Sequence, residues 1–131
     1  MERALLIAVR TSLTLVLLTP LVVNARILPQ TYFPFIVGKA LYAHTLTEIA
    51  FGLWLVLALA FPKYRSPASP LLLIFAAYAL VVMLSSFFGV SLQRSLWSTY
   101  ERMQGFVDLA HWFAFAVVVT SVFRSWGDWR T

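Results

Sequence analysis

The sequence predicts an all-α integral membrane protein in which four helices span the bilayer within a single domain, residues 1–131. Hydrophobic residues make up 61% of the chain and charged residues only 11%, whereas about a quarter of the residues of a soluble domain are charged. So few charges could not cover the surface of a soluble domain this small. Each of four apolar segments also approaches the roughly 20 residues that a helix needs to cross the hydrocarbon core.

The first predicted span covers residues 4–23. Pro20 is expected to kink this helix or end it early, because proline cannot donate a backbone hydrogen bond and clashes with the preceding turn. Residues 1–25 also resemble a cleavable signal peptide, with two arginines before the apolar stretch and a small-residue site after it. The apolar stretch is long for a signal and further spans follow, so we expect a retained helix, with cleavage as the alternative.

The remaining spans are predicted at residues 35–61, 70–92 and 105–123. Pro34 and Pro70 stand at the starts of the second and third spans, where the missing N–H of proline removes no helical hydrogen bond. Prolines and charged residues interrupt the apolar pattern between the segments. These breaks define short loops rather than an additional soluble domain.

The distribution of Lys and Arg predicts that both termini lie in the cytoplasm, because cytoplasmic loops carry the excess of basic residues. With the N-terminus inside, six basic residues fall on the cytoplasmic side and four on the outer side. The cytoplasmic set is Arg3, Arg10, Lys63, Arg65, Arg124 and Arg130, and the outer set is Arg26, Lys39, Arg94 and Arg102.

Composition and motifs argue against several classes of function. The net charge is +5, but the basic residues stand singly at the ends of apolar runs, so no nucleic-acid partner is expected. The chain has no cysteine and two histidines, which are too few for a metal site without carboxylate help. No metal and no cofactor are therefore expected. Glycine-rich phosphate loops, HExxH and nucleophile elbows are missing from the sequence, and no catalytic residue is assigned.

The second span contains ionisable residues at membrane depth, where such groups are costly and usually face a bundle interior or water. Lys39 lies near its outer end, where the ammonium can snorkel to the interface or meet an anionic headgroup. Glu48 lies roughly 13 Å deeper at the helical rise per residue, and His44 stands one turn before it on the same face. A His44–Glu48 hydrogen bond would satisfy both, either as a packing pair or as a proton or substrate site.

A second polar pattern leads into the fourth span. If residues 91–111 formed one helix, six side chains at three- and four-residue steps would share about one third of its circumference. They would form a hydrogen-bond network that fixes helix packing, or an outer polar cleft in which an arginine, steadied by Glu101, binds phosphate or carboxylate. The six residues are Arg94, Trp97, Glu101, Gln104, Asp108 and His111, and Arg102 points to another side.

Two runs of sequence resemble the N-terminal part of O-antigen ligase and polymerase-like proteins. The first is Phe-Pro-Phe-Ile-Val-Gly-Lys at residues 33–39, which enters the second span. The second and more specific run is Arg-Ser-Leu-Trp-Ser-Thr-Tyr-Glu-Arg-Met-Gln-Gly at residues 94–105. The resemblance covers about residues 30–123, which is most of the chain.

The resemblance implies a multi-pass protein of the bacterial inner (cytoplasmic) membrane that serves glycan assembly, lipopolysaccharide and cell-envelope biogenesis. Members of the family transfer glycan from undecaprenyl pyrophosphate to an acceptor at the outer face of that membrane. By the same resemblance, Lys39, Arg94 and Arg102 are candidates to meet the pyrophosphate of the carrier. Trp97 and Glu101 are candidates to support the site.

The sequence also departs from the family. The family's catalytic arginine and histidine belong to a large extracytoplasmic loop in its C-terminal half, and no such loop precedes Thr131. The chain is therefore expected to be the N-terminal part of a larger bundle, inactive alone. Its expected partners are membrane lipid, the lipid-linked glycan, and the missing half or another membrane subunit. Two alternatives stay open: a standalone four-helix protein such as a dimeric proton-coupled exporter, and an accessory membrane subunit without a site.

Overall fold

The structure, a computed structural model, describes residues 1–22, 34–99 and 102–129. In these ranges the chain consists of helices and their connections, without a β-strand, which confirms the all-α prediction. The α-helices are α1 (Glu2–Leu17), α2 (Pro34–Ala60), α3 (Pro70–Phe87), α4 (Leu92–Trp97) and α5 (Phe106–Val122), and the 3-10 turns are η1 (Thr19–Leu21), η2 (Pro62–Tyr64) and η3 (Trp126–Trp129).

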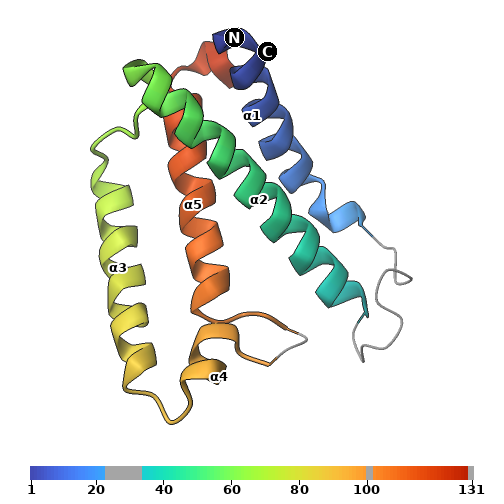
Figure 1. Cartoon of the computed structure of the whole chain (residues 1–131), viewed down its shortest axis with the longest axis vertical. Helices are drawn as coiled ribbons and strands as arrows, with labels where there is room; N and C mark the ends of the chain where they lie inside the picture. Colours follow the sequence, from blue (N-terminus) through green and yellow to red (C-terminus); the bar gives the residue numbers. More distant parts are fainter. Residues whose placement is uncertain (23–33, 100–101, 130–131) are drawn as a thin grey trace.

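α5 is the central helix of the bundle, because it contacts α1, α2, α3 and α4. α1 packs along α2 on one flank, and α3 lies on the other flank of α5 (Figure 1). The short α4 lies at the end of the bundle where α3 ends and α5 begins, whereas the start of α1 and η3 lie together at the opposite end (Figure 1). The start of α1 and η3 therefore face the same side of any membrane that the bundle spans.

Two helical segments are long and apolar enough to cross a membrane, Ile36–Ala60 and Pro70–Phe87. Only 28% of the apolar window of the first and 11% of that of the second is buried inside the protein. A helix that is apolar all round is stable inside a protein core or inside a bilayer, and most of the apolar surface of these two helices is not buried in the core. α5 is apolar but shorter, with 17 residues, and α1 has 16. Two of the four predicted spans are therefore long and apolar enough to cross a membrane.

The first helix ends early, as predicted from its proline. α1 ends at Leu17, and Pro20 lies in the 3-10 turn that follows. A continued α-helix would need an amide hydrogen that Pro20 lacks, and would press its ring against the carbonyl of the preceding turn. The early end is therefore confirmed, and it leaves α1 shorter than the predicted span.

The third helix ends at Phe87, earlier than predicted. Phe88 and Val90 follow it in a turn, with relative exposures of 90% and 110%. Ser91 then opens the separate helix α4, because its side chain accepts a hydrogen bond from a backbone amide of the first turn. Hydropathy alone does not reveal this break, since the apolar pattern continues through Phe88 and Val90.

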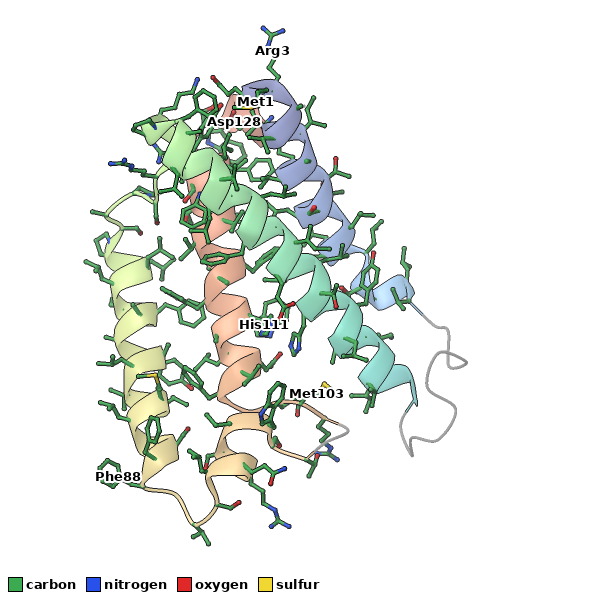
Figure 2. The ribbon with its side chains drawn as sticks, in the orientation of Figure 1. Met1, Arg3, Phe88, Met103, His111 and Asp128 are labelled. Atoms are coloured by element: carbon green, nitrogen blue, oxygen red, sulfur yellow. The ribbon has the colours of Figure 1, made fainter. Side chains whose placement is uncertain are left out.

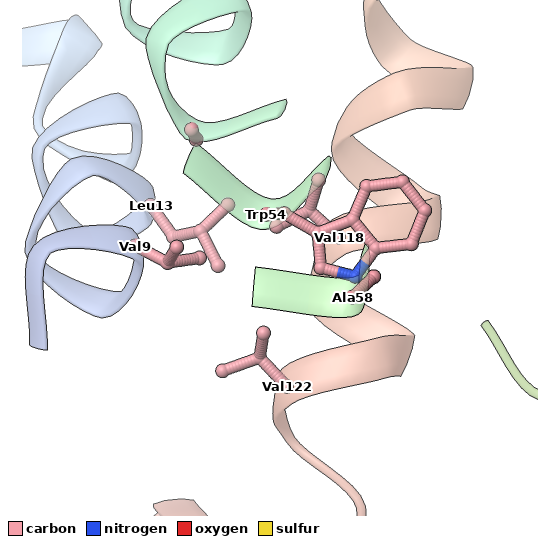
Figure 3. Close-up of a cluster of buried hydrophobic side chains, with 7 residues drawn as sticks. Val9, Leu13, Trp54, Ala58, Val118 and Val122 are labelled. Atoms are coloured by element: carbon pink, nitrogen blue, oxygen red, sulfur yellow. The ribbon is translucent and has the colours of Figure 1, made fainter. Parts of the chain in front are cut away.

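The buried core lies where α1, α2 and α5 meet (Figure 3). Its largest side chain is Trp54, which is 8% exposed. The indole N–H of Trp54 donates to the carbonyl of Tyr64 at 3.0 Å, so the core also holds η2 against α2. The buried cluster consists of Val9, Leu13, Ala50, Trp54, Ala58, Val118 and Val122.

Ion pairs join the elements at the end of the bundle that carries Met1 and Asp128 (Figure 2). Glu2 of α1 lies 2.7 Å from the ammonium of Lys63 and accepts a hydrogen bond from the hydroxyl of Tyr64 at 2.9 Å. These contacts, the Lys63 bond first, hold the pKa of Glu2 below its ordinary value. The same carboxylate raises the pKa of Lys63. The charged forms of both side chains are therefore favoured, and together they attach α1 to η2.

Asp128 ties η3 to α1. One carboxylate oxygen accepts a hydrogen bond from Arg10 at 2.8 Å. The other accepts hydrogen bonds from the amide and the hydroxyl of Ser125, at 2.9 Å and 2.8 Å. The Ser125 hydroxyl, then its amide, and then Arg10 lower the pKa of Asp128. The ionised carboxylate is thus the form that closes this end of the bundle.

Asp128→Asn is expected to lower the stability of the folded bundle at neutral pH and to change it little in strong acid. The folded-state pKa of Asp128 lies below its unfolded value, so the stabilisation is present above the ordinary carboxyl pKa of about 4. It is lost as the pH falls through the lowered folded-state pKa. Thermal unfolding of both proteins in detergent, from about pH 7 to about pH 2, measures the difference. A difference that stays constant over this range would contradict the prediction.

Candidate functional site

Two histidines and two carboxylates meet between α2 and α5, and we call them the His–carboxylate cluster. His44 Nε2 lies 2.8 Å from Asp108 Oδ1, and His111 Nε2 lies 3.0 Å from Glu48 Oε1. His111 lies on the side of α5 that faces α2 (Figure 2). The predicted hydrogen bond between His44 and Glu48 is therefore wrong. Side chains one turn apart on a helix project side by side, and each of these two finds its partner on the opposite helix.

The two pairs form one unit because their imidazoles stack. The ring centroids of His44 and His111 are 4.1 Å apart, with 19° between the ring planes. The two histidine side chains are 13% and 16% exposed, whereas the carboxylates of Asp108 and Glu48 are 28% and 68% exposed. The cluster therefore has a shielded aromatic centre and an open carboxylate side.

Local sequence explains why these four side chains converge. His44 and Glu48 are four residues apart on α2, and Asp108 and His111 are three residues apart on α5, so each helix presents its pair on one face. Asp108 also lies in the first turn of α5, where the positive end of the helix dipole stabilises a carboxylate. The first turn of α5 thus places the Asp108 carboxylate beside His44 of α2.

Acid–base chemistry is what the cluster can offer. Imidazole and carboxylate groups in contact can bind and exchange protons near neutral pH. In residues 1–22, 34–99 and 102–129, no group of three or more His, Asp or Glu side chains is placed to hold a metal ion.

The single helix over residues 91–111 that the polar stripe would require does not form. α4 ends at Trp97, and α5 begins only at Phe106. Between them, Ser98 and Met103 have φ values of 61° and 51°, in the left-handed region that interrupts a right-handed helix. The members of the stripe on α4 are therefore separated from those on α5.

Gly105 closes the turn between α4 and α5 by a close backbone approach. A Cβ atom at this position would lie 2.1 Å from the carbonyl oxygen of Leu96 and 2.7 Å from the amide nitrogen of Trp97. The φ of Gly105 is −92°, which any residue can adopt. The need for glycine at this position is thus steric.

The three cations predicted to meet the carrier do not lie on one element. Arg94 on α4 and Arg102 in the following turn are exposed, and Lys39 on α2 is half-buried. Trp97 beside them is 48% exposed. In the part of the chain that the structure describes, the side chains of these three cations form no ion pair or hydrogen bond. Glu101, which was expected to steady an arginine, lies outside the described residues.

One contact of the cluster is local in sequence and could be expected from it, whereas another is long-range and could not. The carbonyl of Val107 lies 2.7 Å from Nδ1 of His111, and a carbonyl four residues earlier in a helix is a common local partner. The pairing of His44 with Asp108 joins residues 64 positions apart. Local periodicity carries no signal for that pairing, since it depends on how α2 and α5 cross.

A groove of about 620 Å³ lies away from the cluster, between α1 and α5. Arg10 and Asp128 line it together with mostly apolar side chains. Such a lining suits a lipid chain or another helix better than a polar substrate. The apolar lining includes Ile7, Leu13, Leu17, Phe115, Val119 and Phe123.

The fold and the cluster define a class of protein: an α-helical bundle with helices able to cross a bilayer and an ionisable cluster between two of its helices. Comparisons of the chain with protein-family models, with curated proteins and with solved structures found no match. The resemblance to O-antigen ligases therefore rests on the two runs of sequence described above.

Proposed function

We propose that the chain is the membrane-embedded N-terminal portion of a lipid-linked glycan transferase that resembles O-antigen ligases. In this proposal four helices cross the bacterial inner membrane with both termini in the cytoplasm. The turn between α4 and α5 then faces the outer side, where undecaprenyl pyrophosphate presents its glycan. The chain binds or positions that carrier and lacks transferase activity alone.

The observation that carries the proposal of a larger bundle is the exposed side of Glu48. Its side chain is 68% exposed near the middle of α2. A carboxylate at this depth is costly against lipid and normally faces protein or water. Gly52, one turn further along the same face, has open space where a side chain would lie, and Thr45 before it is exposed. This face therefore suits contact with further helices, such as those of a C-terminal half.

The proposed contact with the carrier rests on two exposed arginines close to the start of α5 in the sequence. Arg94 on α4 and Arg102 in the turn that follows are both exposed. Guanidinium groups match the paired oxygens of phosphates and form charge-assisted hydrogen bonds with them. Two exposed guanidinium groups at this end of the bundle suit a pyrophosphate at the membrane surface.

Arg94→Gln and Arg102→Gln are each expected to weaken binding of undecaprenyl pyrophosphate by about tenfold, the effect of losing a charge-assisted hydrogen bond. Titration of the lipid into protein held in neutral nanodiscs measures the affinity. Arg3→Gln is the matched control, because Arg3 is exposed at the opposite end of the bundle (Figure 2). Equal losses in all three variants would show non-specific attraction and contradict the proposal.

The proposal of a separate C-terminal half has its own test. Co-expression of the chain with the C-terminal part of a protein of this kind should restore glycan transfer to cells that lack the transferase. The chain alone should not restore it. Absence of rescue with every C-terminal partner tried would reject the two-part version.

A second candidate function, a small proton-coupled exporter, is favoured by the His–carboxylate cluster. Glu48→Gln should then abolish proton-driven export while the protein still inserts and folds. Export that is unchanged in this variant would reject the exporter. If the arginine variants specifically lose carrier binding and the chain shows no export, the transferase portion is the better description. If the arginine variants change only in stability, an accessory subunit is favoured.

A further inference from the structure

The hydrogen bonds of His111 determine where the protons of the cluster lie. Nδ1 of His111 lies 2.7 Å from the carbonyl oxygen of Val107. A carbonyl can only accept a hydrogen bond, so Nδ1 must carry the hydrogen. In a neutral imidazole with a hydrogen on Nδ1, the other nitrogen, Nε2, is a bare acceptor.

That second nitrogen faces another acceptor. Nε2 of His111 lies 3.0 Å from Oε1 of Glu48, and an ionised carboxylate only accepts hydrogen bonds. Two lone pairs at this distance would repel unless a hydrogen lies between them. We propose that His111 and Glu48 hold one shared proton, as imidazolium with carboxylate or as imidazole with carboxylic acid, and that the cluster is a proton-binding site between α2 and α5.

His44 is the second histidine of this site, and its contact differs from that of His111. A neutral His44 with its hydrogen on Nε2 can donate to Asp108 across 2.8 Å without any additional proton. A further proton would make His44 cationic, 4.1 Å from the ring of His111. Like charges at that distance repel, while the two carboxylates oppose the repulsion. The shared proton is therefore placed on the His111–Glu48 pair, because only that contact needs an additional hydrogen.

The neighbouring elements bring few other charged side chains near the His–carboxylate cluster. α3 contains no Asp, Glu, Lys, Arg or His, and its Tyr78 is exposed. Arg94 of α4 is exposed. On α2 itself, Lys39 precedes His44 by five residues. The charged residues of α1 lie in its first ten residues, at the far end of the bundle: they are Glu2, Arg3 and Arg10.

The geometry also gives the proton a route. Glu48 is 68% exposed whereas His111 is 16% exposed. A proton can therefore arrive on Glu48 from the open side and pass to His111 along the contact between Oε1 and Nε2. This inference does not depend on the glycan carrier.

Nitrogen-15 NMR of the two histidines, with infrared spectroscopy of the carboxyl groups, tests the proposal on the full chain in nanodiscs. At neutral pH, His111 should show both ring nitrogens protonated, or the infrared spectrum should contain the band of a protonated carboxyl group. Either result means that the pair holds the proton. A neutral His111 with a bare Nε2 and no protonated carboxyl band would overturn the proposal.

Glu48→Gln assigns the signal. Its amide can donate a hydrogen bond to a neutral His111, so the shared proton should be lost, together with its NMR or infrared signature. Asp108→Asn is the matched control and should leave that signature in place, because Asp108 partners His44. A signature that persists in Glu48→Gln would also overturn the proposal. If a variant does not fold, the measurement on the unaltered chain still decides the proton count.

Discussion

Gly105→Ala is expected to destabilise the junction of α4 and α5 by about 3 kcal/mol or more. The added Cβ would lie 2.1 Å from the carbonyl oxygen of Leu96, and overpacking of this kind commonly costs 1–3 kcal/mol, sometimes more when backbone must move. The contact is with backbone, so no side-chain rotation can relieve it. Thermal unfolding in detergent, together with limited proteolysis between α4 and α5, measures the effect.

Gly52→Ala is the matched control for this prediction. Apart from its chain neighbours and the adjacent backbone of α2, no atom lies within 4 Å of the position that a Cβ at Gly52 would occupy. Alanine is favoured over glycine inside a helix by up to about 1 kcal/mol. The midpoint of unfolding should stay the same or rise. If both alanine variants lowered it equally, the close approach of Gly105 would not be the cause.

Trp54→Ala is expected to destabilise the bundle by about 3–5 kcal/mol, the range for truncating a large aromatic residue in a core. The substitution removes the largest side chain of the buried cluster. It also leaves the carbonyl of Tyr64 without the indole hydrogen bond. Unfolding of the purified protein in detergent measures the loss, and separation of η2 from α2 should accompany it.

Trp54→Phe separates packing from hydrogen bonding. Phenylalanine keeps an aromatic ring in the cluster but cannot donate to the carbonyl of Tyr64. The loss should be smaller than that of the alanine variant, with about 1 kcal/mol from the hydrogen bond. A phenylalanine variant as unstable as the alanine variant would mean that the indole N–H, and not the packing, dominates at this position.

The helices could be predicted from the sequence because lipid-facing helices need long apolar runs. Pro34 and Pro70 mark the starts of α2 and α3 as predicted, and Pro20 accounts for the end of α1. The end of α3 could not be predicted in the same way. It depends on Ser91 capping the new helix α4, a feature that hydropathy does not detect.

The sequence singles out the four residues of the cluster, in two separate patterns, but does not give their pairings. Ionisable residues inside apolar helices are conspicuous, so His44, Glu48, Asp108 and His111 can all be selected from sequence. Which carboxylate meets which histidine depends on the crossing of α2 and α5. Neighbours on one helix look like natural partners, yet each finds its hydrogen bond on the other helix.

The two pairs that cross between α2 and α5 also fix the register of one helix against the other. Sliding α5 by one residue would move its side chains about 1.5 Å along the helix axis and about 100° around it, which would separate both pairs at once. A change at one position is then tolerated when its partner changes with it. Natural variants of this protein should therefore show correlated substitution of residue 44 with 108 and of residue 48 with 111, and an exchange of His44 with Asp108 should preserve the alignment that either single replacement loses.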